Sequence, residues 1–72
     1  MSILYKDEVN SILAVLRLGC DVILPNGSKL ESDLTNGYIS PVVDGESLGL
    51  WNMDYEGTVN SLKDVGYTKN IK

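Results

Sequence analysis

Three turn signals in the middle of the chain constrain its fold more than any other feature of the sequence. They are the dipeptides Asn26-Gly27, Asn36-Gly37 and Asp44-Gly45. Dipeptides of this kind favour the positive φ angles of tight hairpin turns, and the runs between them are rich in strand-forming residues. Because so short a connection can join only neighbours that run in opposite directions, the middle of the chain is predicted to be an antiparallel meander.

The candidate strands of this meander lie on either side of the turn signals. They cover 21–24, 29–33, 38–43 and 48–53. Pro41 lacks the amide hydrogen that a strand donates to its neighbour. The third range is therefore expected to form an edge strand, to be bulged at Pro41 or to begin there, and the sheet is expected to contain three or four strands.

A helix is predicted before the meander, over about 3–18, because apolar residues recur there at helical spacing. Those residues are Tyr5, Val9, Ile12, Leu13 and Leu16. Ser2 or Asp7 is expected near the start of the helix and Gly19 at its end. Three more apolar residues widen its face beyond what one small sheet would cover, and they are Ala14, Val15 and Leu18. Part of this helix is therefore expected to contact another subunit.

A second, shorter helix is predicted after the meander, over about 54–65. Asp54 is a candidate N-cap, and Glu56 places a negative charge at the positive end of the helix dipole. Gly57 costs about 1 kcal/mol relative to alanine inside a helix, and Gly66 ends the helix. Residues 67–72 are expected to be a loose tail. The predicted fold over 1–72 is one small α+β domain with an N-terminal helix, a three- to four-stranded antiparallel meander and a short C-terminal helix.

The small size of the domain calls for an additional source of stability. A chain of 72 residues buries only about 60% of the surface that its unfolded form exposes, and cores of this size usually need a further constraint. Cys20 is the only cysteine and histidine is absent, so neither an intrachain disulfide nor a zinc site is expected. Self-association is the constraint left. Cys20 itself is expected to be a small buried residue.

The charges of the chain are unevenly distributed. Ten acidic residues against six basic ones give a net charge of −4, which opposes binding to nucleic-acid phosphates. No lysine or arginine lies between Lys29 and Lys63, and the acidic residues of that interval are Glu31, Asp33, Asp44, Glu46, Asp54 and Glu56. Because an acidic patch attracts a basic surface at long range, we expect these six residues to bind a larger protein with a basic surface. The alternative is that they form solvated turns and a solvated strand face.

Trp51 fits two environments. On the last predicted strand, Leu48 and Leu50 point to one face while Trp51 and Met53 point to the other. A helix on one side of the sheet cannot cover both faces. Either the second helix covers the opposite face and Trp51 belongs to the core, or Trp51 is an apolar anchor for a partner, a role in which tryptophan is enriched.

The sequence offers little for catalysis. The absence of histidine removes the commonest general base and the usual activator of a nucleophile. Carboxylate pairs at i, i+2 spacing are present, namely Glu31/Asp33, Asp44/Glu46 and Asp54/Glu56. Such pairs act as acid and base in a pocket that separates their pKa values, and a chain of this size can hardly enclose a cavity of about 300 Å³. We expect no enzyme activity, no cofactor and no metal, since the turn at Asp44 falls short of a calcium loop.

Two functions have sequence features in their favour, and a third, a structural or assembly subunit, has no sequence feature against it. The first is a non-catalytic binding protein that blocks a larger protein. In size and acidic bias the chain resembles the small acidic inhibitors of bacteriophages and mobile elements, including anti-CRISPR and other anti-defence proteins. The second is a homo-oligomer that sequesters a small ligand, such as a nucleotide signal, between subunits, with Arg17, Lys29 or Lys63 as the ligand-binding residues.

Three observations favour a cytoplasmic protein, in the host cytoplasm if the chain is an inhibitor. A single cysteine fits a reducing compartment, and no secretion signal is evident. The longest apolar run, 12–16, has five residues, whereas a membrane-spanning helix needs about 20. No direct contact with membrane or nucleic acid is therefore expected.

Overall fold

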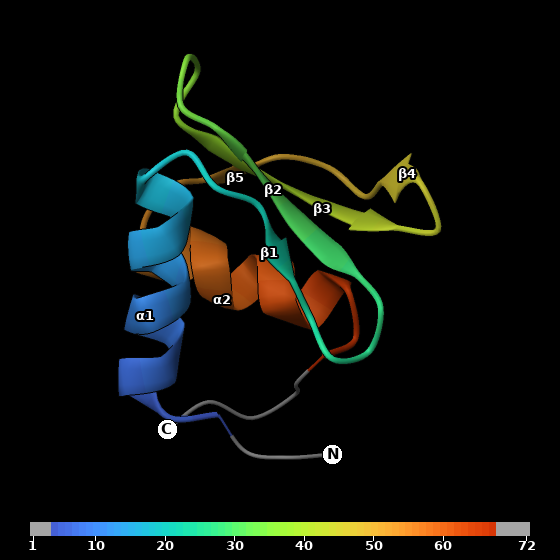
Figure 1. The fold of residues 1–72 in the computed structure, drawn as a ribbon, viewed down its shortest axis with the longest axis horizontal. Helices are drawn as coiled ribbons and strands as arrows, with labels where there is room; N and C mark the ends of the chain where they lie inside the picture. Colours follow the sequence, from blue (N-terminus) through green and yellow to red (C-terminus); the bar gives the residue numbers. More distant parts are fainter. Residues whose placement is uncertain (1–3, 68–72) are drawn as a thin grey trace.

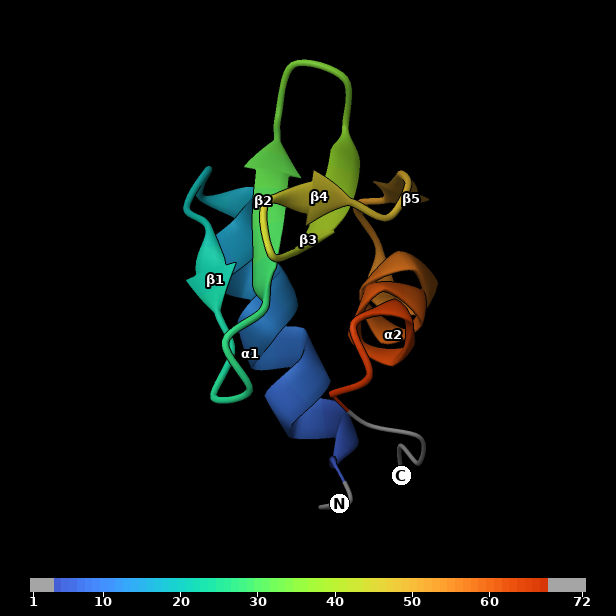
Figure 2. The same ribbon diagram turned by 90° about the vertical axis from the view of Figure 1, so that its right-hand side faces the viewer.

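Two helices pack on the same face of one antiparallel sheet (Figures 1 and 2). The computed structural model describes residues 4–67. Its elements in chain order are α1 (Lys6–Arg17), β1 (Val22–Ile23), β2 (Lys29–Asp33), β3 (Tyr38–Val43), β4 (Glu46–Ser47), β5 (Trp51–Asn52) and α2 (Tyr55–Asp64). The predicted α+β class, with a helix at each end of an antiparallel meander, is confirmed. Ser2 and the predicted tail beyond Tyr67 lie outside the described residues.

β3 is the centre of the sheet. β2 pairs with β3 from Asp33–Tyr38 to Lys29–Val42, and β4 and β5 both lie along the other edge of β3. β1 forms the opposite edge of the sheet, beside β2. The ranges predicted for β2 and β3 are confirmed, and β1 is shorter than expected. The predicted fourth strand over 48–53 is wrong in its bounds, because two short strands, β4 and β5, take its place.

A bulge separates β4 from β5. Between the pairs Val42–Ser47 and Ile39–Trp51, β3 advances by three residues while its neighbour advances by four. One extra residue on one strand defines a β-bulge, and it bends that strand away from its partner. Gly49, within the bulged segment, has a φ of 139°, a conformation that only glycine adopts readily. The bulge is therefore built into the sequence at Gly49.

The bulge explains how proline fits the central strand. The carbonyl oxygen of Pro41 accepts a hydrogen bond from the Leu48 amide at 2.8 Å. In an antiparallel ladder the nitrogen and the carbonyl of one residue point to the same neighbour. The ring nitrogen of Pro41 therefore faces the bulged segment. The regular hydrogen bonds of the ladder are interrupted there, so no backbone donor is required at Pro41. All three placements predicted for Pro41 are therefore wrong: β3 is a central strand, begins at Tyr38 and is itself regular, and the bulge lies on the neighbouring segment.

The turns differ from one another in length. Asp44 and Gly45 form the predicted two-residue turn, with φ angles of 51° and 82°. The other two connections are longer, over 24–28 and 34–37, and in each of them only the glycine has a positive φ. The hairpins form where the turn signals predict them, but only one of the three turns has the tight form expected for its dipeptide.

α1 buries one stripe of side chains and exposes the rest. Val9, Leu13 and Leu16 are buried, as predicted. Tyr5 is exposed, so its predicted place in the apolar stripe is wrong. The reason is that Tyr5 is the N-cap residue, with extended backbone, and precedes the first turn. Asp7 is not the cap but lies in that first turn.

α2 begins and ends where the sequence predicts. The Oδ1 atom of Asp54 accepts a hydrogen bond from the Gly57 amide at 2.7 Å, which confirms Asp54 as the N-cap. At the other end the Tyr67 amide donates to the Leu62 carbonyl at 3.0 Å. Gly66 has a φ of 71° there. This is the usual way in which a glycine closes a helix.

Gly57 allows α2 to lie against the backbone of β5. A Cβ atom at this position would lie 1.7 Å from the carbonyl oxygen of Asn52, far inside van der Waals contact. The sequence predicts only a cost of glycine in a helix. The structure shows that the missing side chain of Gly57 allows direct contact between the first turn of α2 and the backbone of β5.

One hydrophobic core joins both helices to the sheet. Its buried residues are Leu4, Val9, Leu16, Leu24, Leu30, Ile39, Leu62 and Val65. Asn26 adds a polar link: its Nδ2 atom donates to the Val65 carbonyl at 3.2 Å, and its Oδ1 atom accepts from the Ser28 amide at 3.1 Å. The loop between β1 and β2 is thereby fastened to the C-terminal end of α2.

The prediction that Cys20 is buried is wrong, because its side chain is exposed. Cys20 lies in the connection from α1 to β1, and β1 is an edge strand. Apolar neighbours in the sequence therefore do not enclose it. Neither helix within residues 4–67 has the length and apolar character needed to cross a membrane.

Candidate partner-binding surface

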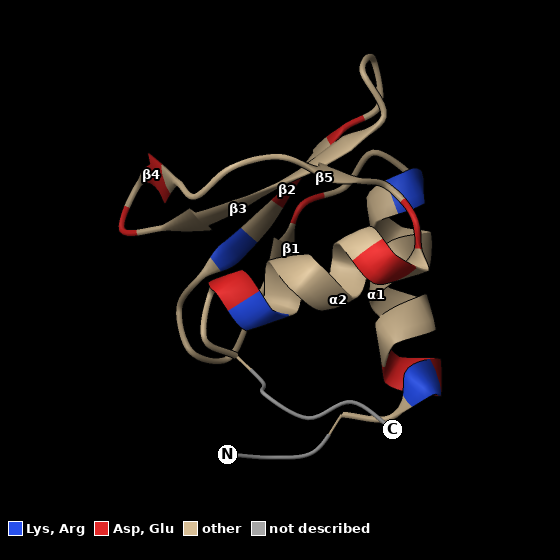
Figure 3. Ribbon diagram, turned by 180° about the vertical axis from the view of Figure 1, so that it is seen from behind, with Lys and Arg blue, Asp and Glu red and all other residues tan. Residues whose placement is uncertain are grey.

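The six carboxylates predicted to bind a partner do not gather on one surface of the protein (Figure 3). Asp44 and Glu46 lie at the turn between β3 and β4. Asp33 is the last residue of β2 and pairs with Tyr38, so it lies at the other end of β3 from Asp44 and Glu46. Asp54 and Glu56 lie at the start of α2. The sixth residue, Glu31, lies within β2. The six residues are close in sequence and are divided among separate places in the fold.

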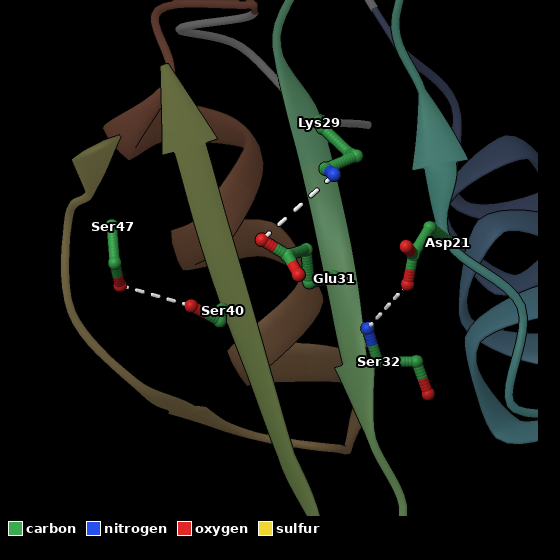
Figure 4. Close-up of polar contacts among 6 residues, drawn as sticks. All are labelled: Asp21, Lys29, Glu31, Ser32, Ser40 and Ser47. Atoms are coloured by element: carbon green, nitrogen blue, oxygen red, sulfur yellow. Dashed lines mark hydrogen bonds and ion pairs between the residues drawn. The ribbon is translucent and has the colours of Figure 1, made fainter. Parts of the chain in front are cut away.

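Polar side chains from β2, β3 and β4 lie together on the outer face of the sheet, away from the helices (Figure 4). Glu31 pairs across the strands with Ser40 on this face. The Lys29 ammonium lies 3.9 Å from a carboxylate oxygen of Glu31, which is the one ion pair within residues 4–67. The hydroxyl oxygens of Ser40 and Ser47 lie 2.9 Å apart. Glu31 is therefore partly neutralised by a cation on its own strand.

Asn36 holds Asp33 in its ionised form. The Asn36 side-chain amide donates to Asp33 Oδ2 at 2.9 Å, and the Asn36 backbone amide donates to Oδ1 at 3.2 Å. These two hydrogen bonds, the side-chain one first, lower the pKa of Asp33 below its ordinary value of 3.8. A carboxyl with a lowered pKa stabilises the fold above its unfolded pKa, and this contribution is lost as the pH falls through the folded value.

We expect Asn36→Ala to raise the pKa of Asp33 part of the way toward 3.8, because the side-chain donor is lost and the backbone donor stays. The carboxyl carbon of Asp33, followed by NMR during an acid titration, reports this value. Thr35→Ala is the matched control, since it shortens the neighbouring side chain and keeps both donors from Asn36. An unchanged titration in Asn36→Ala would contradict the assignment.

Two exposed leucines, Leu48 and Leu50, follow Asp44 and Glu46 along the same edge of β3. Leu48 is 44% exposed and Leu50 is 60% exposed. Both leucines belong to the bulged segment that Gly49 directs away from β3. We call these four residues, Asp44, Glu46, Leu48 and Leu50, the bulge surface. The sequence indicated that the last strand carries apolar groups on both faces, and the bulge decides which of them reach solvent.

Trp51 faces the helices and is half-buried. It pairs with the buried Ile39, and its Nε1 atom donates to Asp64 of α2 at 2.7 Å. Because both helices pack on this face, the expectation that the second helix covers the opposite face is wrong. Met53 is half-buried against the same core. Trp51 is thus held at the margin of the core by α2, while its neighbours Leu48 and Leu50 are exposed.

Asp54 and Glu56 serve the start of α2. The carboxylate of Asp54 caps the helix through Gly57, and its carbonyl oxygen accepts from the Thr58 hydroxyl at 2.8 Å. Glu56 is exposed in the first turn. The cap gives Asp54 a structural role whatever partner the protein binds.

The three cations of the alternative ligand site do not share a surface within one chain. Arg17 ends α1 and Lys63 lies in the last turn of α2, and these helix ends lie on opposite sides of the molecule (Figure 1). Lys29 lies on the outer face of β2, paired with Glu31. A site built from all three would need residues from more than one copy of the chain.

Metal-ligating residues are dispersed in the same way. Within the part of the chain that the structure describes, no three histidine, cysteine, aspartate or glutamate residues are grouped so that they could hold a metal ion. Comparisons with protein-family models, with curated proteins and with solved structures found no match to the chain.

Proposed function

We propose that this protein is a small non-catalytic binding protein that uses the bulge surface to dock on a basic surface of a larger protein. The observation that carries the proposal is the order of side chains along one edge of the sheet. Two carboxylates at the turn into β4, Asp44 and Glu46, are followed along that edge by two exposed leucines. Apolar anchors with a charged rim are the usual anatomy of a protein–protein interface.

The leucines supply the contact that excludes water. Both project from a segment fixed by the ladder on each side, through Ser47 before it and Trp51 after it. The backbone of a segment held in this way loses little additional freedom on binding, which reduces the entropic cost of the interface. Leu50, the more exposed of the two, is the better candidate for the central anchor.

The carboxylates supply attraction at long range. Within residues 4–67 neither Asp44 nor Glu46 forms an ion pair, and the sequence holds no lysine or arginine between Lys29 and Lys63. Surface charges of this kind act mainly on the rate of encounter and on its salt dependence. A basic groove that normally receives nucleic-acid phosphates is a suitable target, and an acidic protein seated there would block it. This is the mode of action expected from the compositional resemblance to small acidic inhibitors.

The charge of the bulge surface can be removed without disturbing its shape. We expect Asp44→Asn with Glu46→Gln to lower the association rate constant about three- to tenfold at low ionic strength and to flatten its salt dependence. Asparagine keeps the tolerance for the positive φ of position 44, so the free energy of unfolding should change by less than about 0.5 kcal/mol. The measurement is binding kinetics at several salt concentrations, with a protein recovered from a bacterial lysate by the wild-type chain.

Two controls make this test specific. Asp7→Asn with Glu8→Gln removes the same two charges from the first turn of α1 and should leave the kinetics unchanged. Leu50→Ala should mainly speed dissociation, because apolar anchors act on the complex once it has formed. The intact mass of the recovered protein should stay the same after incubation, as expected if the chain binds without modifying it. Equal effects of the two double variants would contradict the proposed surface.

A further inference from the structure

Two of the turn signals, Asn26-Gly27 and Asn36-Gly37, place an asparagine before a glycine. In such a pair the backbone nitrogen of the glycine can attack the side-chain carbonyl carbon of the asparagine, because glycine has no side chain to obstruct the approach. No other asparagine of the sequence is followed by glycine. Both pairs lie in hairpin loops, and both glycines have a positive φ. Any difference in reactivity between the two asparagines must therefore come from the fold around them.

The fold holds Asn26 by both ends of its side-chain amide. The Nδ2 atom donates to the Val65 carbonyl at 3.2 Å, and the Oδ1 atom accepts from both the amide and the hydroxyl of Ser28. These three hydrogen bonds are partly buried, and Ser28 itself is buried. The side chain can turn toward Gly27 only when these bonds break, which frees the β1–β2 loop from the C-terminal end of α2.

Asn36 is held by one end of its side chain. Its Nδ2 atom donates to Asp33 Oδ2 at 2.9 Å, and its Oδ1 atom accepts no hydrogen bond within residues 4–67. This bond is exposed and joins residues three positions apart. Exposed local hydrogen bonds open more readily than those that tie distant segments together. The two glycine nitrogens are equally engaged, since Gly37 donates to the Asp33 carbonyl at 2.8 Å and Gly27 to the Leu24 carbonyl at 2.9 Å.

We propose that Asn36 is a site of spontaneous deamidation in the folded protein and that the fold protects Asn26 from the same reaction. The Gly37 nitrogen gives up its proton to solvent and forms a bond to Asn36 Cγ. The bond from Cγ to Nδ2 breaks, and Nδ2 takes up a proton from solvent and leaves as ammonia, which produces a cyclic imide. Water then adds to one of the two imide carbonyls and opens the ring. Residue 36 becomes aspartate or isoaspartate.

The reaction changes the connection between the β2–β3 loop and β5. The Gly37 carbonyl accepts a hydrogen bond at 3.0 Å from the amide of Met53, the residue directly after β5. Isoaspartate at position 36 adds one atom to the main chain before Gly37 and so displaces this carbonyl. Either product also replaces the amide that donates to Asp33 by a carboxylate, which repels it. This inference does not depend on the proposed function, because it concerns a loop outside the bulge surface.

The first experiment follows deamidation of the intact chain at mildly alkaline pH. Peptide mapping by mass spectrometry at successive times gives separate rates for Asn26 and Asn36. We expect Asn36 to react at least about tenfold faster, because release of Asn26 breaks two more hydrogen bonds than release of Asn36 does. In urea, where the chain is unfolded, the two rates should become similar. An unreactive Asn36, equal rates in the folded protein, or the same difference in urea would overturn the proposal.

Two variants test whether these hydrogen bonds set the rates. Ser28→Ala removes the hydroxyl donor from Asn26 and keeps the backbone donor, so it should raise the rate at Asn26 and leave Asn36 unchanged. Asp33→Ala removes the acceptor of the Asn36 side chain and should have the opposite selectivity. Circular dichroism confirms that both variants are folded. Unchanged rates at both asparagines, or equal acceleration of both in each folded variant, would reject the assigned protection.

The effect on β5 is measured on the separated product. Deamidation adds a negative charge, so ion-exchange chromatography isolates the modified chain. We expect the Met53 amide to exchange its hydrogen at least about tenfold faster in the isoaspartate form, because its acceptor is displaced. Asn36→Asp is the matched control, since it carries the added charge without the additional main-chain atom and should exchange at close to the wild-type rate. Equal exchange in the isoaspartate form and the unmodified chain would contradict the proposed connection.

Discussion

Gly57→Ala is expected to lower the free energy of unfolding by about 3 kcal/mol, and it has the largest effect that we expect from a single methyl group in this protein. In most helices the change from glycine to alanine stabilises, by about 1 kcal/mol. Here the added Cβ would overlap the Asn52 carbonyl oxygen, at 1.7 Å, and approach the Asn52 carbonyl carbon at 2.8 Å. Both are backbone atoms of β5, so α2 and the sheet must move apart to accept it.

Urea unfolding followed by circular dichroism measures this loss. Asn10→Ala is the control, because it replaces an exposed residue inside α1 by the best helix former and introduces no contact with the sheet. We expect that variant to gain a few tenths of a kcal/mol. A Gly57→Ala variant that is as stable as the wild type would show that α2 does not lie against β5 in the way described.

Leu62→Ala is the second substitution with a large expected effect. Leu62 is fully buried in the core, and replacing a buried leucine by alanine costs about 2 to 5 kcal/mol. Since small domains have a total stability of about 5 kcal/mol, a large share of the variant should be unfolded at 37 °C. The fraction unfolded can be read from a thermal melt.

Leu50→Ala is the matched control for this substitution. It removes the same atoms from a side chain that is 60% exposed, so its cost should stay within about 0.5 kcal/mol. The same variant weakens partner binding if the bulge surface is correct. If the two leucine variants prove equally destabilised, the division of these leucines between core and surface is wrong.

Local signals in the sequence suffice for much of the fold. β2 and β3 have the predicted bounds, because a turn signal ends each of them and no competing pattern overlaps them. Asp54 caps α2 as predicted, since an N-cap depends on a carboxylate and on amides only a few residues away. Each of these features is decided by residues that are close together in the chain.

The features that could not be predicted depend on contacts between distant residues. The bulge at Gly49 depends on the register between β3 and the segment that follows β4. It faces Pro41, which has no amide hydrogen to donate to a regular neighbouring strand. The role of Gly57 depends on β5 lying beside it. Cys20 is exposed because of where the sheet ends, which its apolar neighbours in the sequence do not indicate.

The site was harder to predict than the fold for a geometric reason. In an antiparallel meander, consecutive turns lie at opposite ends of the sheet. Asp33 and Asp44 therefore lie far apart, although both belong to one acidic stretch of the sequence. Leu34 is a single leucine in a polar loop, and its sequence neighbours do not indicate that it packs over Gly19 at the end of α1.

The bulge at Gly49 also bears on whether the sheet edge formed by β4 and β5 can pair with a strand of another molecule. An edge strand with a regular row of free amides and carbonyls can recruit the same edge of another molecule, which is the route to fibrils. Here β4 and β5 are each two residues long, and the chain between them departs from the ladder. An incoming strand would find no continuous register on which to grow. The protein can thus expose Leu48 and Leu50 on its sheet edge without offering a template for polymerisation.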